Sequence, residues 1–153
     1  MNRYWKYLLI IFFIIPACKK DAIQLKPGEV ITGTKWNLVS LYVENPTGSP
    51  PADITSASFD PCELDDLIEF KPGGNYSCTE NSDICPNNAS VFHAMNGGNW
   101  VITGDTLLSI SAGFILQTYR FGKITNSTIE LRQSLVNYFG EPMVYRFNLR
   151  SAQ

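Results

Sequence analysis

Apolar and polar residues alternate with period two from Gly33 onward, and turn-forming residues interrupt the alternation at short intervals. This spacing is typical of β-strands joined as antiparallel neighbours. No stretch of ten residues shows helical periodicity. We predict eight strands, over residues 34–43, 66–71, 75–79, 99–103, 105–111, 114–124, 128–134 and 143–150. Compact turns at 72–75, 104–105 and 125–127 join some of them, and residues 44–61 form a long irregular connection.

Eight consecutive strands with mostly short links predict an up-and-down meander, and closure into a barrel hides the edges of a long meander best. We therefore predict an all-β fold over residues 33–150, an eight-stranded antiparallel barrel. An open two-sheet sandwich is the alternative. Strand parity places Trp36, Leu38 and Tyr42 on one face of the first strand.

The first 17 residues are typical of a secretory signal peptide. Arg3 and Lys6 precede an apolar run over residues 8–15, which is too short for the ~20 residues of a spanning helix. Pro16 and Ala17 follow, and then Cys18. The stretch from residue 15 to Cys18 resembles a bacterial lipobox, which implies that Cys18 becomes the lipid-bearing first residue of the mature chain.

The alternative to lipidation is an ordinary cleaved signal with a Cys beside the cut. With lipidation, residues 18–32 comprise the lipidated Cys and a flexible tether, since Pro27 and Gly28 interrupt any period. The expected location is the cell outer membrane, on its periplasmic face or at the cell surface. The acyl chains supply the membrane attachment.

Several short motifs within residues 33–149 follow one another in a recognisable order: Gly33-Thr34-Lys35-Trp36, Cys62 before an acidic pair, Phe70 to Tyr76, and Gly98 to Ile102. Their order and spacing resemble the lipocalin-like domain of Bacteroidetes lipoproteins. The resemblance implies an eight-stranded antiparallel barrel that binds a small molecule.

Three thiols remain once Cys18 is acylated, which allows one disulfide in an oxidising compartment. The resemblance places a Cys at both Cys62 and Cys85, and both lie in loop-like stretches that flank the hairpin over residues 66–79. We predict a bridge between them, with Cys62–Cys78 as the alternative. Cys78 shares parity with Tyr76 and is expected to be a buried free thiol.

We predict no metal, no cofactor and no enzymatic activity. A zinc site of Cys62, Cys78, Cys85 and His93 lacks close ligand pairs, because the gaps are 16, 7 and 8 residues. The acidic run over residues 60–66 lacks the calcium-loop pattern.

No serine nucleophile motif occurs, although a Cys78–His93 dyad stays open. Glu69 and Glu130 are expected to face solvent, not each other across a cleft. A formal net charge of -2 leaves no basic excess for binding nucleic acid.

Aromatic residues decide how much space an eight-stranded barrel leaves inside, because such an interior is filled by side chains or holds one small ligand. The candidates for a ligand-lined interior are Trp36, Phe70, Tyr76, Trp100, Tyr119, Tyr145 and Phe147. A void of about 300 Å³ or more would support ligand binding. We also expect Arg146 or Arg150 to cover the face of Trp36.

These observations predict a lipid-anchored, non-catalytic protein whose partners are the membrane and a small apolar or planar ligand, in or at the mouth of the barrel. The alternative is a structural or protein-interaction lipoprotein with a filled barrel.

Overall fold

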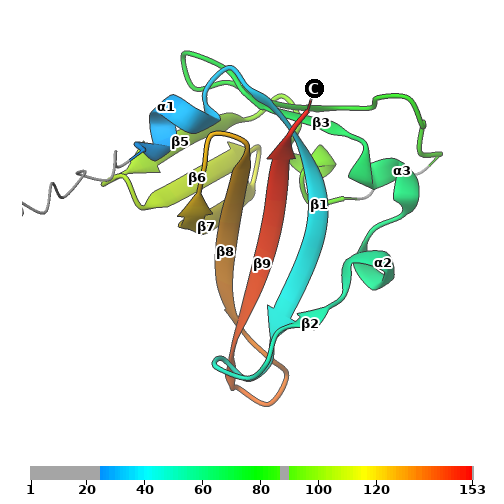
Figure 1. Ribbon diagram of the computed structural model, residues 1–153, viewed down its shortest axis with the longest axis vertical. Helices are drawn as coiled ribbons and strands as arrows, with labels where there is room; N and C mark the ends of the chain where they lie inside the picture. The colour runs from blue at the N-terminus through cyan, green and yellow to red at the C-terminus, as the bar shows by residue number, and fades with distance from the viewer. Residues whose placement is uncertain (1–24, 87–89, 153) are drawn as a thin grey trace, which may run out of the picture.

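A computed structural model describes residues 25–86 and 90–152 (Figure 1). The signal peptide and Cys18 lie outside the described residues. Within them, one sheet contains β1 (Lys35–Glu44), β2 (Ala52–Asp53), β3 (Leu67–Phe70), β4 (Tyr76–Thr79), β5 (Asn99–Thr103), β6 (Leu107–Ala112), β7 (Ile115–Ile124), β8 (Thr128–Val136) and β9 (Pro142–Ser151). Each of the eight predicted strands has a counterpart whose ends differ by at most two residues.

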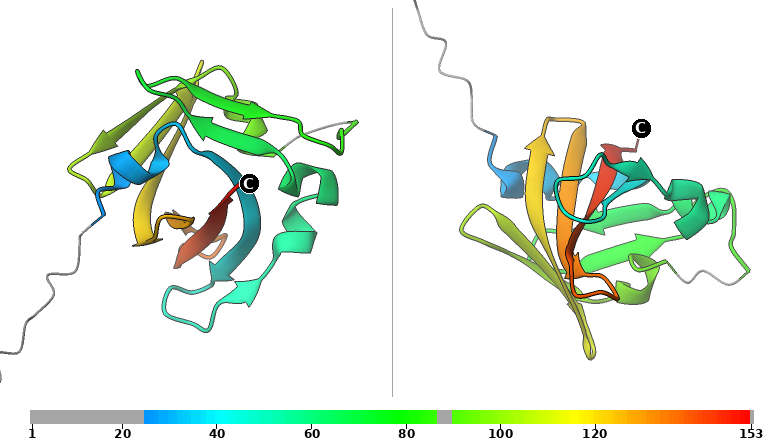
Figure 2. Two further views of the ribbon diagram at one scale, coloured as in Figure 1. Left: turned by 45° about the horizontal axis from the view of Figure 1, so that its top comes forward. Right: turned by 90° about the horizontal axis from the view of Figure 1, so that it is seen from below.

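The strands form an antiparallel meander, in the order β4-β3-β1-β9-β8-β7-β6-β5. β2 adds a short pairing with β1 off this path. The first and last long strands pair along most of their length, from Trp36 opposite Ser151 to Glu44 opposite Val144. The sheet therefore curls around an interior, with the β3–β4 and β5–β6 hairpins at its two edges (Figure 2).

The curled sheet does not close into a continuous barrel, which corrects part of the prediction. β4 and β5 meet only at an isolated bridge, where Tyr76 N–H donates to the Gly98 carbonyl and Trp100 N–H to the Gly74 carbonyl. Further along β4, the Cys78 N–H donates to the side-chain oxygen of Asn96 at 3.0 Å. A side chain of the connecting loop thus takes the place of the neighbouring strand, and the ladder stops there.

The connection between β4 and β5 enters the interior at this seam. Its 3₁₀ helix η1 (His93–Met95) is short, and Phe92 and Met95 are fully buried in the core. The loop returns to the sheet through Gly98, where a Cβ atom would lie 2.2 Å from the Ser111 carbonyl oxygen. Only glycine allows this approach. The described part of residues 80–98 fills the unclosed side of the sheet, and we call this connection the plug.

A β-bulge in β1 changes which residues face inward. The register with β9 shifts between Leu38 and Ser40, so Leu41 is buried while Tyr42 is only half-buried. The prediction that Trp36, Leu38 and Tyr42 share one face is therefore wrong for Tyr42, because the extra residue of a bulge reverses the parity beyond it.

The predicted tether ends earlier than residue 32. Residues Pro27–Ile31 form the short helix α1, and Ile31 is fully buried. The indole N–H of Trp36 donates to the Ile31 carbonyl at 3.3 Å, so α1 covers one end of the interior. Arg146 is one of the two arginines expected to cover the face of Trp36. It does not do so, because it pairs with Glu44 near the far end of β1.

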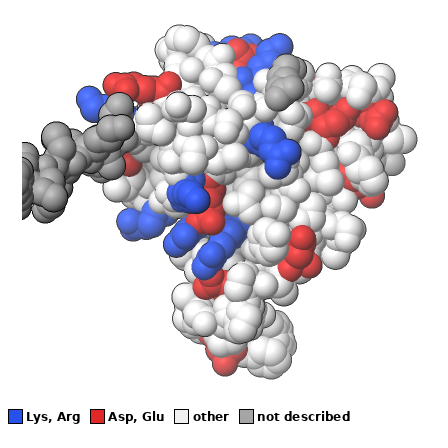
Figure 3. Space-filling view, in the orientation of Figure 1, with Lys and Arg blue, Asp and Glu red and all other residues white. Residues whose placement is uncertain are grey.

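The remaining helices, α2 (Thr55–Ser58) and α3 (Pro61–Leu64), lie in the connection between β2 and β3, beside β1 (Figure 1). In the part of the chain that the structure describes, no helix has the length and apolar character needed to cross a membrane. On the outer face of the sheet, Figure 3 shows Lys and Arg side chains gathered with acidic side chains between them. The ion pairs Arg132–Glu130 and Arg146–Glu44 lie on β8 and between β9 and β1, respectively.

Candidate ligand-binding site

A pocket of about 250 Å³ opens at the end of the interior that α1 does not cover. It lies next to the cross-strand pair of Leu41 and Phe147, and Leu41 is five residues after Trp36 on β1. Its apolar and aromatic lining is Leu41, Phe59, Val91, Tyr145 and Phe147, and its polar lining is Ser58, Ser90, Gln117 and Gln133. We call this hollow the mouth pocket. It falls just short of the size that would by itself support a ligand-filled interior.

Strand parity explains how the polar residues reach the mouth pocket. Gln117 lies two residues before the buried Tyr119 on β7, and Gln133 lies two residues after the buried Leu131 on β8. Both amides therefore project toward the interior, where Gln133 Nε2 donates to Gln117 Oε1. The two Gln residues were not among the predicted site residues. Two polar residues at inward positions of neighbouring strands are the signal that would have found them.

An aromatic cluster packs against Phe147, which lines the mouth pocket. Phe92 stacks on Tyr119 with ring centroids 6.3 Å apart, and Phe147 meets both rings edge-on at 5.5 and 5.6 Å. Edge-on and offset contacts of this kind are favourable between rings. The plug residue Phe92 thus occupies the space that a ligand would need deeper in the barrel.

The seven predicted lining residues separate into three groups. Tyr145 and Phe147 line the mouth pocket. Trp36, Phe70, Tyr76 and Tyr119 are fully buried in the packed core. Trp100 is half-buried against Phe70, and its indole N–H donates to the Lys71 carbonyl at 3.0 Å. The interior is therefore filled by side chains, and the space for a ligand lies at its mouth.

The buried residues Tyr76 and Tyr119 differ in the hydrogen bonding of their hydroxyl groups. The Tyr76 hydroxyl donates to the Phe92 carbonyl at 3.0 Å, whereas the Tyr119 hydroxyl has no partner among the described residues. Burial raises the pKa of both phenols, so both stay neutral across the physiological range.

The same substitution at these two tyrosines should have opposite effects on the free energy of unfolding. Tyr76→Phe removes one of the two hydrogen bonds to the Phe92 carbonyl, which keeps the Met95 N–H at 3.3 Å, and should cost about 0.5–1.5 kcal/mol. Tyr119→Phe removes an unsatisfied hydroxyl and should be neutral or stabilising. Urea denaturation of the two variants beside the wild type measures both effects. A loss of 1 kcal/mol or more in Tyr119→Phe would mean that a partner, such as a buried water or a ligand, satisfies its hydroxyl.

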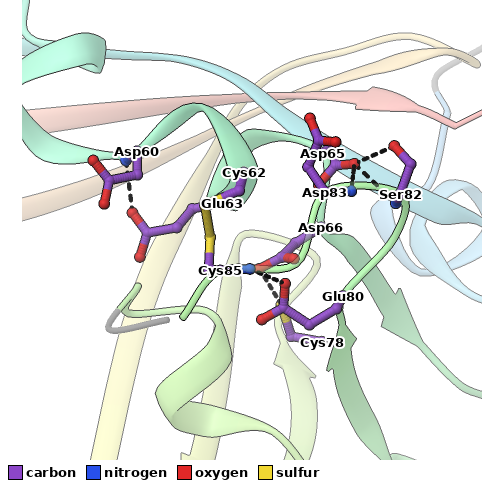
Figure 4. Close-up of a disulfide and its surroundings, with 10 residues drawn as sticks. All are labelled: Asp60, Cys62, Glu63, Asp65, Asp66, Cys78, Glu80, Ser82, Asp83 and Cys85. Atoms are coloured by element: carbon purple, nitrogen blue, oxygen red, sulfur yellow. Dashed lines mark hydrogen bonds between the residues drawn. A yellow bond between two sulfur atoms is a disulfide. The ribbon is translucent and has the colours of Figure 1, made fainter. Parts of the chain in front are cut away.

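The disulfide joins Cys62 to Cys85, as predicted, and the Cys62–Cys78 alternative is excluded (Figure 4). Cys78 is a buried free thiol, also as predicted. Since Cys62 and Cys85 are bonded to each other, the four-ligand zinc site with His93 cannot form in this state. The bridge ties the first turn of α3 to the connection between β4 and β5.

The acidic run before β3 serves local structure. Asp60 and Glu63 form the capping box of α3, in which the Glu63 carboxylate accepts the Asp60 N–H at 2.8 Å. Asp65 Oδ2 accepts hydrogen bonds from Ser82 and from the Asp83 N–H, and these contacts lower the pKa of that carboxyl (Figure 4). On the outer face, Glu69 pairs with Lys71 and Glu130 with Arg132.

Cys78 and His93, the predicted open dyad, do lie together, with Asp66 as a third member. Burial in the core, together with the nearby Asp66 carboxylate, raises the pKa of the Cys78 thiol to about 12. A thiol that stays protonated at neutral pH is a poor nucleophile. This arrangement does not favour cysteine nucleophilic chemistry.

The fold defines a class: an antiparallel β-meander curled around an apolar interior, with a pocket at one mouth, is the architecture of lipocalin-like proteins. The sequence model of the lipocalin-like domain family matches residues 31–131, about two thirds of the chain. The chain therefore belongs to the lipocalin-like domain family. A comparison with curated proteins gives no match.

Proposed function

We propose that this protein is a lipid-anchored, extracytoplasmic member of the lipocalin-like family that binds a small apolar or planar ligand at the mouth of its barrel. Membership of the family supports ligand binding in general. The observation that carries the finer proposal is the mouth pocket, where Phe59, Tyr145 and Phe147 supply apolar walls and Gln117 and Gln133 supply polar groups. A few polar groups in an apolar concavity are what orient a small ligand.

The filled interior limits the ligand to a small one. The mouth pocket holds about 250 Å³, and Phe92 packs against Phe147, which lines it. A flat ring system that stacks on Tyr145 and Phe147 fits this shape, with its polar edge toward the two Gln amides. A long acyl chain would need the space that the plug occupies.

Ligand binding can be tested by filling the mouth pocket without touching the core. Ser58 is exposed and lines the pocket, whereas Ser56 is exposed on the same helix and does not. Ser58→Trp should weaken binding of a planar hydrophobic fluorophore, such as anilinonaphthalene sulfonate, at least tenfold in a fluorescence titration, and Ser56→Trp should leave it unchanged. Saturable binding that is equal in both variants would place the fluorophore elsewhere.

The lipid anchor is supported by the lipobox-like stretch that ends at Cys18. Cys18→Ser should release the protein from the membrane fraction or leave an unprocessed precursor, because the acyl chains are what hold it there. Immunoblots of fractionated cells measure both outcomes. Normal processing with unchanged membrane partition would contradict the proposal.

A second candidate function is that of a non-catalytic structural or interaction lipoprotein. The filled interior favours it, as do Tyr138 and Phe139, which are exposed in the turn between β8 and β9. Failure of the wild-type protein to bind any planar fluorophore saturably would favour this candidate over ligand binding.

A further inference from the structure

Asp66, Cys78 and His93 bring three kinds of metal-ligating atom to one place, although they belong to separate segments. Asp66 directly precedes β3, Cys78 lies on β4, and His93 begins η1. One ligand atom from each side chain lies within 4.8 Å of the others. Asp66 and Cys78 are buried and His93 is half-buried, so the cluster lies just beneath the surface.

Sheet register explains the pairing of the first two residues. Ile68 is the cross-strand partner of Cys78, and Asp66 lies two residues before Ile68, so all three project toward the interior. The Cys78 thiol lies 3.9 Å from Asp66 Oδ2. Figure 4 shows the two side chains together near the disulfide.

The plug brings the third residue. The His93 N–H donates to Ser90 Oγ at 3.1 Å, and Asn96 Oδ1 accepts the Cys78 N–H, so hydrogen bonds fix the loop on both sides of the imidazole. His93 Nδ1 is buried and has no hydrogen-bond partner among the described residues. A buried ring nitrogen without a partner is costly, and a metal ion beside it would use its lone pair.

We propose that Asp66, Cys78 and His93 form a binding site for a divalent cation of the zinc type, at the seam where β4 and β5 do not pair. Carboxylate oxygen, thiolate sulfur and imidazole nitrogen are the donors that zinc takes, whereas calcium and magnesium take oxygen alone. Ligand atoms around a tetrahedral zinc ion lie about 3.3–3.8 Å apart, from bond lengths of about 2.0–2.3 Å. The three ligand atoms, which lie within 4.8 Å of one another, would each have to move by up to about 1 Å to reach that spacing.

Three protein ligands leave a fourth position for water. The metal replaces the proton of the Cys78 thiol. That proton passes to the solvent as the sulfur–metal bond forms. Bound there, the ion would fasten the plug to the β3–β4 hairpin. Because the plug also contributes Ser90 and Val91 to the mouth pocket, the ion would hold one wall of that pocket in place.

The test uses the full chain with Cys18→Ser, kept in mild detergent and oxidised at Cys62–Cys85, so that Cys78 is the only free thiol. After treatment with a chelator, calorimetric titration with Zn²⁺ should show one ion per chain. Titration with Co²⁺ should show a thiolate-to-cobalt charge-transfer band together with visible bands of a tetrahedral ion. Absence of stoichiometric uptake, or cobalt binding without the thiolate band, would overturn the proposal.

Variants then test the individual ligands. Cys78→Ser, His93→Gln and Asp66→Asn should each weaken Zn²⁺ binding at least tenfold, since even residues behind the ligands contribute about 10–100-fold. Asp83→Asn changes an exposed carboxylate of the same loop and should leave the affinity unchanged. Equal affinity in Cys78→Ser and the wild type would overturn the proposal. The cobalt spectrum of the wild-type cluster needs no variant, so it decides the question even where a variant fails to fold.

Discussion

Trp36→Ala is expected to destabilise the domain by about 3–5 kcal/mol, as for other buried large aromatic side chains. The indole is fully buried where β1 meets β3 and β9, opposite Ile68 and Ser151. It also donates to the Ile31 carbonyl, so its loss removes one of the hydrogen bonds that hold α1 over this end of the interior. Because domains of this size are typically stable by about 5–15 kcal/mol, the loss approaches complete unfolding. Urea denaturation measures it.

Trp100→Ala is the matched control for this prediction. Its indole also donates to a backbone carbonyl, that of Lys71, but its ring is only half-buried. Its loss should therefore cost clearly less. A Trp36→Ala variant that unfolds within about 0.5 kcal/mol of the wild type would mean that α1 and the indole do not seal the interior in solution.

The strands were predictable because their signal is local. Alternation and turn residues fall within a few positions of each other, and the compact turns form as expected: Lys71 N–H donates to the Asn75 carbonyl and Thr125 N–H to the Thr128 carbonyl. The disulfide was predictable for a different reason, since it rested partly on a family resemblance. The strand signal thus lies within each stretch of the sequence, whereas the pairing of Cys62 with Cys85 depended partly on the resemblance to a family.

The features that sequence reasoning missed depend on contacts between distant segments. The bulge between Leu38 and Ser40 adjusts β1 to β9, and alternation within β1 alone gives no sign of it. The unclosed seam depends on Asn96, whose side chain takes the Cys78 N–H that a ladder to β5 would otherwise bond. The sequence gives no sign that this Asn accepts a strand N–H, because the loop around it is rich in Asn and Gly.

The candidate site was half predictable for the same reason. Tyr145 and Phe147 were found because aromatic residues at inward positions stand out, but Phe92 was not, since it lies in a loop. Because the plug places Phe92 in the interior, most of the seven predicted lining residues are core residues and do not line a ligand cavity. Most of those rings pack against one another or against Phe92, and the space that the described interior offers a ligand lies at its mouth.

Removal of the disulfide by Cys62→Ser and Cys85→Ser together is expected to lower the free energy of unfolding by about 3 kcal/mol. The bridge closes a loop with a sequence separation of 23 residues, and the loop entropy that it removes from the unfolded chain corresponds to roughly that value. The loop contains the β3–β4 hairpin, which has just two ladder pairs with β1, Lys35–Glu69 and Trp36–Ile68, and otherwise meets the sheet at isolated bridges. The hairpin thus has few ladder contacts of its own and depends on the bridge.

Urea denaturation with and without a reducing agent supplies the control. The reductant should lower the unfolding midpoint of the wild type to that of the double variant and should leave the double variant unchanged. Hydrogen exchange adds a spatial test, because protection should fall first in β4 and the plug, which the bridge holds at the open seam, and last in β8 and β9, which pair along nine residues. Equal midpoints for oxidised and reduced wild-type protein would show that the core contacts of Tyr76 and Phe92 hold the seam without the bridge.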